Sequence, residues 1–386
     1  MVTKNQPRLF DYGLSKDQEK RARHLHEDSI IINMLALGLV GSEAFTEEMN
    51  KQLKDDYELF HDFWVRTQGL CMSMPVEMAI RGEFPALKEW WDISGVTASV
   101  GQVRTPLDII YRDIALWTLG FDNADWLVKV RKTDDIRRIK AEGKHGAFLY
   151  IQCMDWQGDL DILDTMSRFG VKGIQLTYNN MNIVGSGCTE RTDAGISNFG
   201  AMVIQRMNQL GMLVDTGHCG HQTTVDACAL SKQPVIASHT MAKGVYSHDR
   251  AKSDDSLLAL AKTGGVIGIA ITPFLISDAE VVTMEHYLNQ LDYVVKLIGW
   301  EHVGIGTDWP FQLPDWALEL MTQYVVQSMG FRKEHRFNDI ITTHGYIDCR
   351  DFINITRGLV ARGYTDEQIR GILGGNWLRV MDAVWK

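Results

Sequence analysis

The stretch GMLVDTGHCGH, residues 211–221, passes from an apolar segment directly into Asp215 and His218. The stretch QPVIASHT, residues 233–240, repeats the pattern: Val235 and Ile236 are apolar, and His239 follows. Each apolar run has the length and composition of a strand that is covered on both faces of a parallel sheet. Two consecutive buried strands that both end in histidine predict that the two imidazoles lie side by side at one edge of that sheet.

Six further apolar runs resemble these two, and amphipathic segments separate most of them. Residues 197–211 form one such segment, in which Ser197 or Asn198 is the expected cap and Gly211 the expected end of a helix. An alternation of eight strands with helices predicts an α/β fold, the (β/α)8 or TIM barrel. The eight predicted strands lie in residues 29–35, 96–102, 146–152, 173–178, 213–218, 234–239, 265–271 and 302–308.

The whole chain, 1–386, is predicted to form a single domain, because barrels of this length are common. The first two strands are too far apart for one connecting helix, so residues 41–94 are predicted to be a helical insertion. Residues 314–386 are predicted to be a C-terminal helical section. The insertion is rich in aromatic residues, which suggests a homodimer surface; the alternative is that these side chains are buried in the core.

The composition excludes some classes of partner. A net charge of −10 disfavours binding to nucleic acid or to an anionic membrane surface. No apolar run approaches the roughly 18 residues that a membrane span needs, and the N-terminus has no signal-like apolar segment. Six cysteines without a Cys-x-x-Cys pair indicate reduced thiols, so a cytoplasmic location is expected. Cys219, beside His218, is either a weak ligand or, as we favour, a small space-filling residue.

The residues that end the strands predict a metal site. In such barrels the working residues lie at the carboxyl ends of the strands, where His218, His239 and Asp308 are expected to meet. Imidazole nitrogen and carboxylate oxygen are ligands that Zn²⁺ and similar divalent ions accept. A bound ion lowers the pKa of water and polarises a carbonyl group, and Asp308 either ligates the ion or accepts a proton from that water.

Two residues in the predicted loops are further candidates for the site. Arg250 is predicted to bind a carboxylate of the substrate, and an equally weighted alternative is a surface ion pair with Asp249, Asp254 or Asp255. His221 either supports the ligands or is simply exposed.

Several motifs together resemble the membrane (renal) dipeptidases, which are metal-dependent amidohydrolase-type barrels. The motifs are GVKGIQLTYNNMN (170–182), GISNFGAMVIQRMNQLGMLVDTGHCG (195–220), PVIASHT (234–240), ALAKTGGVIGI (259–269), HVGIGTDWPF (302–311) and GGNWLRVM (374–381). The resemblance implies a site for two zinc ions, with His218 and His239 as ligands of the second ion. It also implies that Asp308 assists the water nucleophile or the substrate amine, and that Arg250 holds the substrate carboxylate.

Other positions depart from the family pattern. The strand-one His and Asp positions hold Met34 and Ala36, and the bridging Glu position holds Gln152. Two cations without an anion between them repel each other, so one ion rather than two is expected. Gln152 is then predicted to orient substrate or to ligate weakly. Tyr178 replaces the histidine that stabilises the oxyanion in the family and is predicted to donate a hydrogen bond there. Asp155 or Asp159 either replaces the missing carboxylate or belongs to an ordinary helix start.

The sequence therefore predicts a hydrolase that uses one zinc or other divalent ion to cleave an amide or peptide-like bond in a small-molecule substrate. One alternative is a metal-dependent lyase, such as a decarboxylase, on the same barrel, because barrels change reaction type through their strand-end residues. The other alternative is a non-catalytic binding protein that kept the fold.

Overall fold

The computed structural model of the chain describes residues 6–36, 40–152, 154, 156–337 and 342–386. Its centre is a closed barrel of eight parallel strands in the order β2-β1-β10-β8-β7-β6-β5-β4, and β4 pairs back onto β2. Each strand overlaps one of the eight predicted runs, so the (β/α)8 prediction is confirmed. The strands are β1 (Ile32–Asn33), β2 (Ala98–Val103), β4 (His145–Ile151), β5 (Val171–Gln175), β6 (Leu213–Asp215), β7 (Val235–Thr240), β8 (Ile267–Ile269) and β10 (Val303–Ile305).

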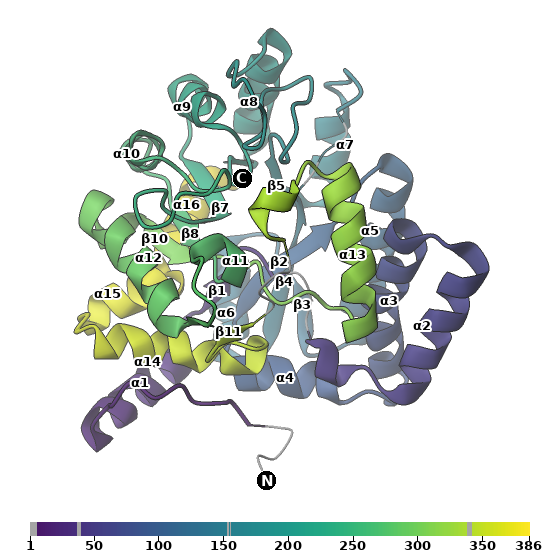
Figure 1. Cartoon of the computed structure of the whole chain (residues 1–386), viewed down its shortest axis with the longest axis vertical. Coiled ribbons are helices and arrows are strands. Elements are labelled where there is room, and N and C mark those ends of the chain that lie inside the picture. Colours follow the sequence, from purple (N-terminus) through teal and green to yellow (C-terminus); the bar gives the residue numbers. More distant parts are fainter. Residues whose placement is uncertain (1–5, 37–39, 153, 155, 338–341) are drawn as a thin grey trace.

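Helices surround the barrel (Figure 1). Most of them follow a strand and return the chain to the start of the next one, which is what allows neighbouring strands to be parallel. The predicted helix 197–211 is α8; the Ser197 hydroxyl accepts the Gly200 N–H, and Gly211 ends the helix with a φ of 69°. The surrounding helices are α5 (Leu107–Asn123), α6 (Thr133–Ala141), α7 (Ile162–Phe169), α8 (Asn198–Leu210), α9 (His221–Leu230), α10 (Asp254–Lys262) and α12 (Met284–Ile298).

Three short strands were not predicted. Strand β3 (Leu127–Lys129) pairs with the first residues of β4, whereas β5 pairs with the last residues of β4. Strands β9 (Val282–Thr283) and β11 (Thr343–His344) form a two-residue parallel pair outside the barrel. All three are too short to show a periodic pattern, so the sequence could not distinguish them from loop.

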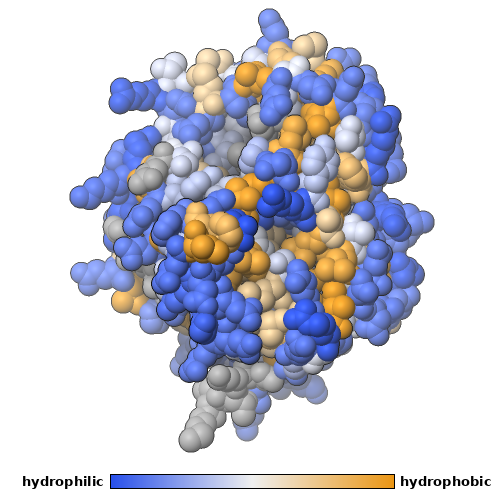
Figure 2. Space-filling view, turned by 90° about the vertical axis from the view of Figure 1, so that its right-hand side faces the viewer, coloured by the Kyte–Doolittle hydropathy of each residue, from blue (hydrophilic) through white to orange (hydrophobic). Residues whose placement is uncertain are grey.

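The segment 41–94 contains the predicted helices, namely η1 (Ser42–Ala44), α2 (Glu47–Phe60), η2 (Phe63–Thr67), α3 (Gln68–Ile80) and α4 (Ala86–Ser94). Phe63, Trp90 and Trp91 are buried in the main core, whereas Phe60 is 48% exposed. Figure 2 shows apolar side chains gathered on the face of the molecule that these helices help to form. Because most of the aromatic groups named here pack internally, they do not by themselves support a dimer, and the homodimer stays a prediction.

The C-terminal section supports the barrel from inside and outside. Trp377 belongs to the apolar cluster inside the barrel, and its indole N–H donates to the carbonyl oxygen of Ile305 at 3.2 Å. Helix α1 (Lys16–Asp28) packs against α14. Within the described chain, no helix combines the length and the apolar character that crossing a bilayer requires. The C-terminal elements are α13 (Asp315–Ser328), η4 (Lys333–His335), η5 (Cys349–Phe352), α14 (Ile353–Ala361), α15 (Asp366–Arg370), η6 (Gly371–Gly375) and α16 (Asn376–Val384).

Candidate functional site

Three of the predicted site residues lie together at the carboxyl ends of barrel strands. His218 lies three residues beyond β6, His239 lies within β7, and Asp308 lies three residues beyond β10. The Nε2 atom of His218 is 2.8 Å from the Nε2 atom of His239, and the latter is 3.9 Å from Oδ2 of Asp308. All three side chains are almost inaccessible to solvent. The parallel sheet thus brings these groups to one point, as the pattern of strand ends predicted.

The hydrogen bonds of His218 determine which of its nitrogens carries the proton. Its Nδ1 atom lies 2.7 Å from Oδ1 of Asn179. The amide nitrogen of Asn179 donates to the carbonyl oxygen of Met329 at 2.7 Å, which fixes the orientation of that amide. Since an amide oxygen only accepts, Nδ1 of His218 must be the donor. The Nε2 atom of His218 therefore carries a free lone pair.

The same reasoning applies to His239 through a chain of buried groups. The Ser238 hydroxyl donates to Oδ2 of Asp215 at 2.6 Å and lies 2.8 Å from Nδ1 of His239. Because the hydroxyl proton is used on the carboxylate, the hydroxyl oxygen accepts from Nδ1 of His239. The Asp215 carboxylate is held in turn by the Tyr150 hydroxyl and the Gly217 N–H. Nε2 of His239 therefore also carries a lone pair.

Two lone pairs that face each other at 2.8 Å repel unless a cation or a proton lies between them. Burial, with a further contribution from the charge of Arg250, holds the pKa of both His218 and His239 well below its ordinary value. Neutral imidazoles with converging Nε2 atoms are suited to a divalent metal ion. The Nε2 atoms of two imidazoles that bind one tetrahedral zinc ion lie about 3.3 Å apart. To bind such an ion, the Nε2 atoms of His218 and His239 would have to move apart by about half an ångström. Among the described residues, no group of three His, Cys, Asp or Glu side chains stands ready to hold an ion.

Gln152 completes the inner side of this pair. Its amide nitrogen lies 3.4 Å from Nε2 of His218 and 3.3 Å from Nε2 of His239. Its amide oxygen accepts from the amide nitrogen of Gln102 at 2.7 Å. Rotating both amides together by half a turn preserves the bond between them and directs the Gln152 oxygen at the imidazoles. The Gln152 side chain can thus present either a donor or a metal ligand to this point.

Asp308 differs from an ordinary surface carboxylate in two respects. Its backbone has a φ of 52°, and its N–H donates to the carbonyl oxygen of Leu35 at 3.0 Å, beside the first strand. Burial raises the pKa of Asp308 to about 7, although the charge of Arg250 opposes that shift. A carboxyl group with such a pKa can both accept and donate a proton near neutral pH.

Tyr178 stacks on His218, with ring centroids 3.9 Å apart and an angle of 19° between the rings. This contact holds the plane of the imidazole. Tyr178 also lines the cavity at the mouth of the barrel, so the structure places it beside the imidazole pair.

Arg250 is buried, with 1% of its surface exposed. Its two terminal nitrogens donate to the carbonyl oxygens of Gly217 at 2.6 Å and His239 at 3.3 Å, and its Nε atom has no hydrogen-bond partner among the described residues. The alternative of a surface ion pair is wrong, because Arg250 is buried and Asp249 pairs with Arg332 instead. The role in substrate binding stays a prediction.

The remaining predicted positions that the structure describes make no contact with the imidazole pair that would serve a metal ion. Met34 is buried inside the barrel, and Ala36 lines a second cavity. Asp159 is exposed, and Asp155 lies outside the described residues. His221 contacts the hydroxyl groups of two serines on its Nδ1 side. Burial raises the pKa of Cys219 to about 11, which favours the space-filling interpretation of that residue.

Sequence reasoning missed the groups that orient the imidazoles. Asn179 directly follows Tyr178, and Ser238 directly precedes His239. A polar residue next to a strand-end histidine is the signal that was available. This signal was not sufficient, because the amide of Asn179 is oriented by a hydrogen bond that it donates to the carbonyl oxygen of Met329, far along the chain.

A cavity opens in front of these residues. Gln152, His218 and Asp308 lie in its wall. The rest of the lining is largely apolar and comes mainly from α11 (Pro273–Ile276), from α13 and from the loops beside them. The cavity can therefore enclose a small molecule and exclude much of the water around it. Its larger apolar lining residues are Trp64, Phe274, Phe311, Met321, Phe331 and Phe337.

Comparison with known proteins places this site in a family. The chain is 31% identical to dipeptidase verJ of Clonostachys rogersoniana over 225 residues, or 58% of this chain and 51% of that protein. It is 26% identical to dipeptidase tcpJ of Claviceps purpurea over 291 residues, or 74% of this chain and 61% of that protein. The matches thus span about half to three-fifths of these relatives. An amidohydrolase structure from Pseudomonas aeruginosa superposes with a TM-score of 0.76 at 26% identity, covering 94% of this chain and 99% of that one.

The match that decides the family is longer than half of the chain. Residues 115–324 match membrane dipeptidase, peptidase family M19. This range contains His218, His239 and Asp308, and the resemblance noted from the sequence motifs is confirmed. The protein belongs to the membrane dipeptidase family, peptidase family M19.

Proposed function

We propose that the chain is a metal-dependent hydrolase that uses one divalent ion, zinc in the first instance, to cleave an amide or peptide-like bond of a small molecule. The observation that carries this proposal is the pair of Nε2 lone pairs of His218 and His239, which face each other at the mouth of the barrel, with His218 in the wall of the cavity. The naming of relatives as dipeptidases supports an amide bond as the target.

His218 and His239 are the residues that would hold the ion. A third protein ligand has two sources, Oδ2 of Asp308 or the amide oxygen of Gln152 after rotation. When bound, the ion lowers the pKa of a water molecule and polarises the carbonyl group of the substrate. A second ion fits poorly, because Met34 and Ala36 supply no hard ligand and Gln152 supplies no negative charge to separate two cations.

The protein groups around this point have separate tasks. Asp308, with its raised pKa, takes a proton from water and passes it to the leaving amine. Gln152 and Tyr178 line the cavity and orient the substrate carbonyl. The charge of Arg250 lies close to both imidazole segments and favours a negatively charged group, such as a substrate carboxylate, in the cavity.

Elemental analysis of the purified protein, together with a panel of dipeptides followed by mass spectrometry, tests the proposal. About one ion per chain and products that gain one water are expected, and His239→Ala should lose both the ion and the turnover. Loss of carbon dioxide from a substrate would point instead to the lyase alternative. Two ions per chain with ordinary hydrolysis would contradict the single-ion proposal. A protein without any ion would support the non-catalytic alternative.

A further inference from the structure

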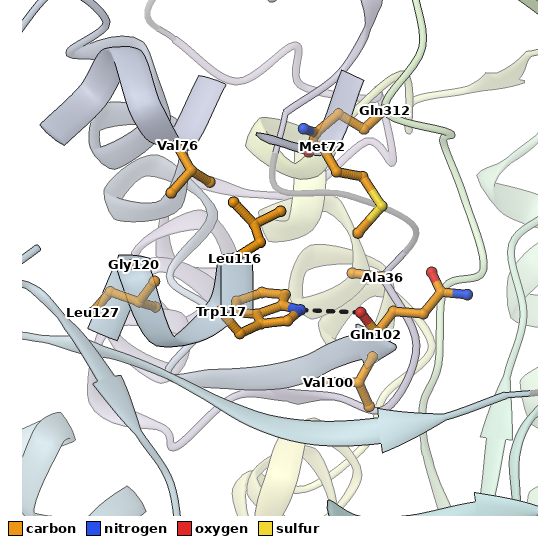
Figure 3. Close-up of a pocket in the computed structure, with 10 residues that line it drawn as sticks. All are labelled: Ala36, Met72, Val76, Val100, Gln102, Leu116, Trp117, Gly120, Leu127 and Gln312. Carbon is orange, nitrogen blue, oxygen red and sulfur yellow. Dashed lines mark hydrogen bonds between the residues drawn. The ribbon is translucent and has the colours of Figure 1, made fainter. Parts of the chain in front are cut away.

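A second cavity lies beside the candidate site. We name it the side pocket; it is lined chiefly by Ala36, Met72, Val76, Gln102, Leu116 and Trp117. Figure 3 shows these side chains arranged around one space, with Met72 and Val76 coming from α3 and Leu116 and Trp117 from α5. None of the described residues that line it carries a charge.

The side pocket lies where the short pairing between β1 and β2 ends. Strand β1 pairs with β2 through only two residues, Ile32 and Asn33, opposite the first two residues of β2. On its other edge, β2 pairs with β4 along its whole length, from Ala98 to Val103. Ala36, which follows β1, and Gln102, in the second half of β2, line the pocket together with residues of the helices α3 and α5. Ala36 occupies the position at which the family resemblance places an aspartate, so the smaller side chain also leaves room here.

The side pocket adjoins the candidate site, and Gln102 lies between the two cavities. This residue lines both cavities, and its amide nitrogen donates to Gln152 at 2.7 Å. Gln152 in turn lies 3.3 Å from Nε2 of His239. The indole N–H of Trp117 donates to the Gln102 carbonyl oxygen at 3.0 Å, which holds the ring at the wall of the pocket (Figure 3). A group bound in the side pocket therefore lies one residue away from the imidazole pair.

We propose that the side pocket binds an uncharged apolar side chain of the substrate, of the size of leucine or methionine, while the adjoining amide bond lies at the imidazole pair. The inference rests on the proposed function and adds the class of substrate. An apolar lining favours a branched or flexible hydrocarbon, and the Gln102 carboxamide marks the side of the pocket that faces the candidate site. A charged side chain is disfavoured because it would be desolvated without a counter-charge.

Binding of dipeptide analogues in which CH₂–NH replaces the amide tests this, because such compounds cannot be cleaved. Leucyl-alanine and alanyl-leucine analogues are compared with the alanyl-alanine analogue by titration calorimetry of the full chain. Whichever of the two leucine-containing analogues binds more tightly should bind at least about tenfold more tightly than the alanyl-alanine analogue. Leu116→Trp fills the pocket and should abolish that preference. Leu119→Trp, three residues along the same helix and 40% exposed, should retain it.

Circular dichroism verifies that each variant is folded, and Val76→Phe fills the same space if Leu116→Trp does not fold. A leucine preference below about twofold in the natural protein, or one that survives both filling variants, overturns the inference. Turnover of ordinary dipeptides is measured separately. Cleavage without an apolar preference would refute the side pocket alone. An apolar preference without cleavage would refute the hydrolase and leave the pocket as a ligand site.

Discussion

Removing the Ser238 hydroxyl should weaken metal binding without unfolding the protein. In Ser238→Ala the Nδ1–H of His239 loses its acceptor at 2.8 Å, and Asp215 loses a donor at 2.6 Å. The imidazole is then no longer held in the tautomer that leaves Nε2 free. A proton on Nε2 would occupy the position that the ion needs. The substitution should therefore weaken metal binding by His239, although residue 238 itself does not bind the ion.

The magnitude follows from these contacts. Loss of a group that orients a metal-binding imidazole typically weakens ion affinity by about 10- to 100-fold, which corresponds to about 1.4 to 2.7 kcal/mol. Asp215 keeps the donors from Tyr150 and Gly217. The free energy of unfolding should therefore fall by only about 1 to 3 kcal/mol, as for one buried polar group, the Nδ1–H of His239, that is left without its partner.

Competition with a chromophoric chelator near neutral pH measures the zinc affinity, and urea unfolding in excess chelator measures stability. Ser99→Ala is the matched control, because the Ser99 hydroxyl of β2 is also buried and donates to the Asn33 carbonyl oxygen at 3.1 Å. It should lose stability and keep the affinity. The reasoning is refuted if Ser238→Ala binds zinc as tightly as the natural protein, or if Ser99→Ala loses affinity equally.

Three further predictions concern stability and charge. Burial lowers the pKa of His26 from 6.5 to about 4, although its Nε2 atom lies 3.1 Å from the carbonyl oxygen of Ser94. As the pH falls below 6.5 the unfolded chain takes up this proton first, so the free energy of unfolding should decrease by up to about 1.4 kcal/mol per pH unit. Urea unfolding across this range measures the decrease, and His26→Gln should reduce the slope. Gln152→Glu places a negative charge beside the imidazoles and should tighten zinc binding at least about tenfold in the same chelator assay; an unchanged affinity would show that the ion binds elsewhere. Gly268→Ala places a Cβ atom 2.0 Å from the Ser238 carbonyl oxygen. The free energy of unfolding, measured by thermal unfolding, should therefore fall by more than about 3 kcal/mol. An unchanged melting temperature would contradict the packing described.

Much of the barrel followed from local pattern alone. The runs around Leu213 and Val235 are apolar on both faces, and that feature depends only on neighbours in sequence. Strand β3 was not predicted, because only one of its three residues, Leu127, is a buried apolar residue. It also pairs with only part of β4. Its strand character comes from that partner and not from its own composition.

The candidate site likewise has features that the sequence could predict and features that it could not. His218, His239 and Asp308 could be identified because each follows or ends a buried strand, and Gln152 because it departs from a family motif. The burial of Arg250 could not be predicted, since its guanidinium is held by backbone carbonyl oxygens that carry no signal of residue type. The side pocket was equally hidden, because it arises where pairing between β1 and β2 stops.

The sequence by itself determined the barrel and the identity of the groups at its mouth, because strand length, burial on both faces and strand ends are properties of contiguous residues. Only the tertiary structure decided which nitrogen of each imidazole faces the other imidazole. That choice depends on Asn179 and Ser238 and, through Asn179, on a carbonyl oxygen of Met329. Directions of hydrogen bonds between distant segments exist only once the chain has closed into a barrel, so no local pattern records them.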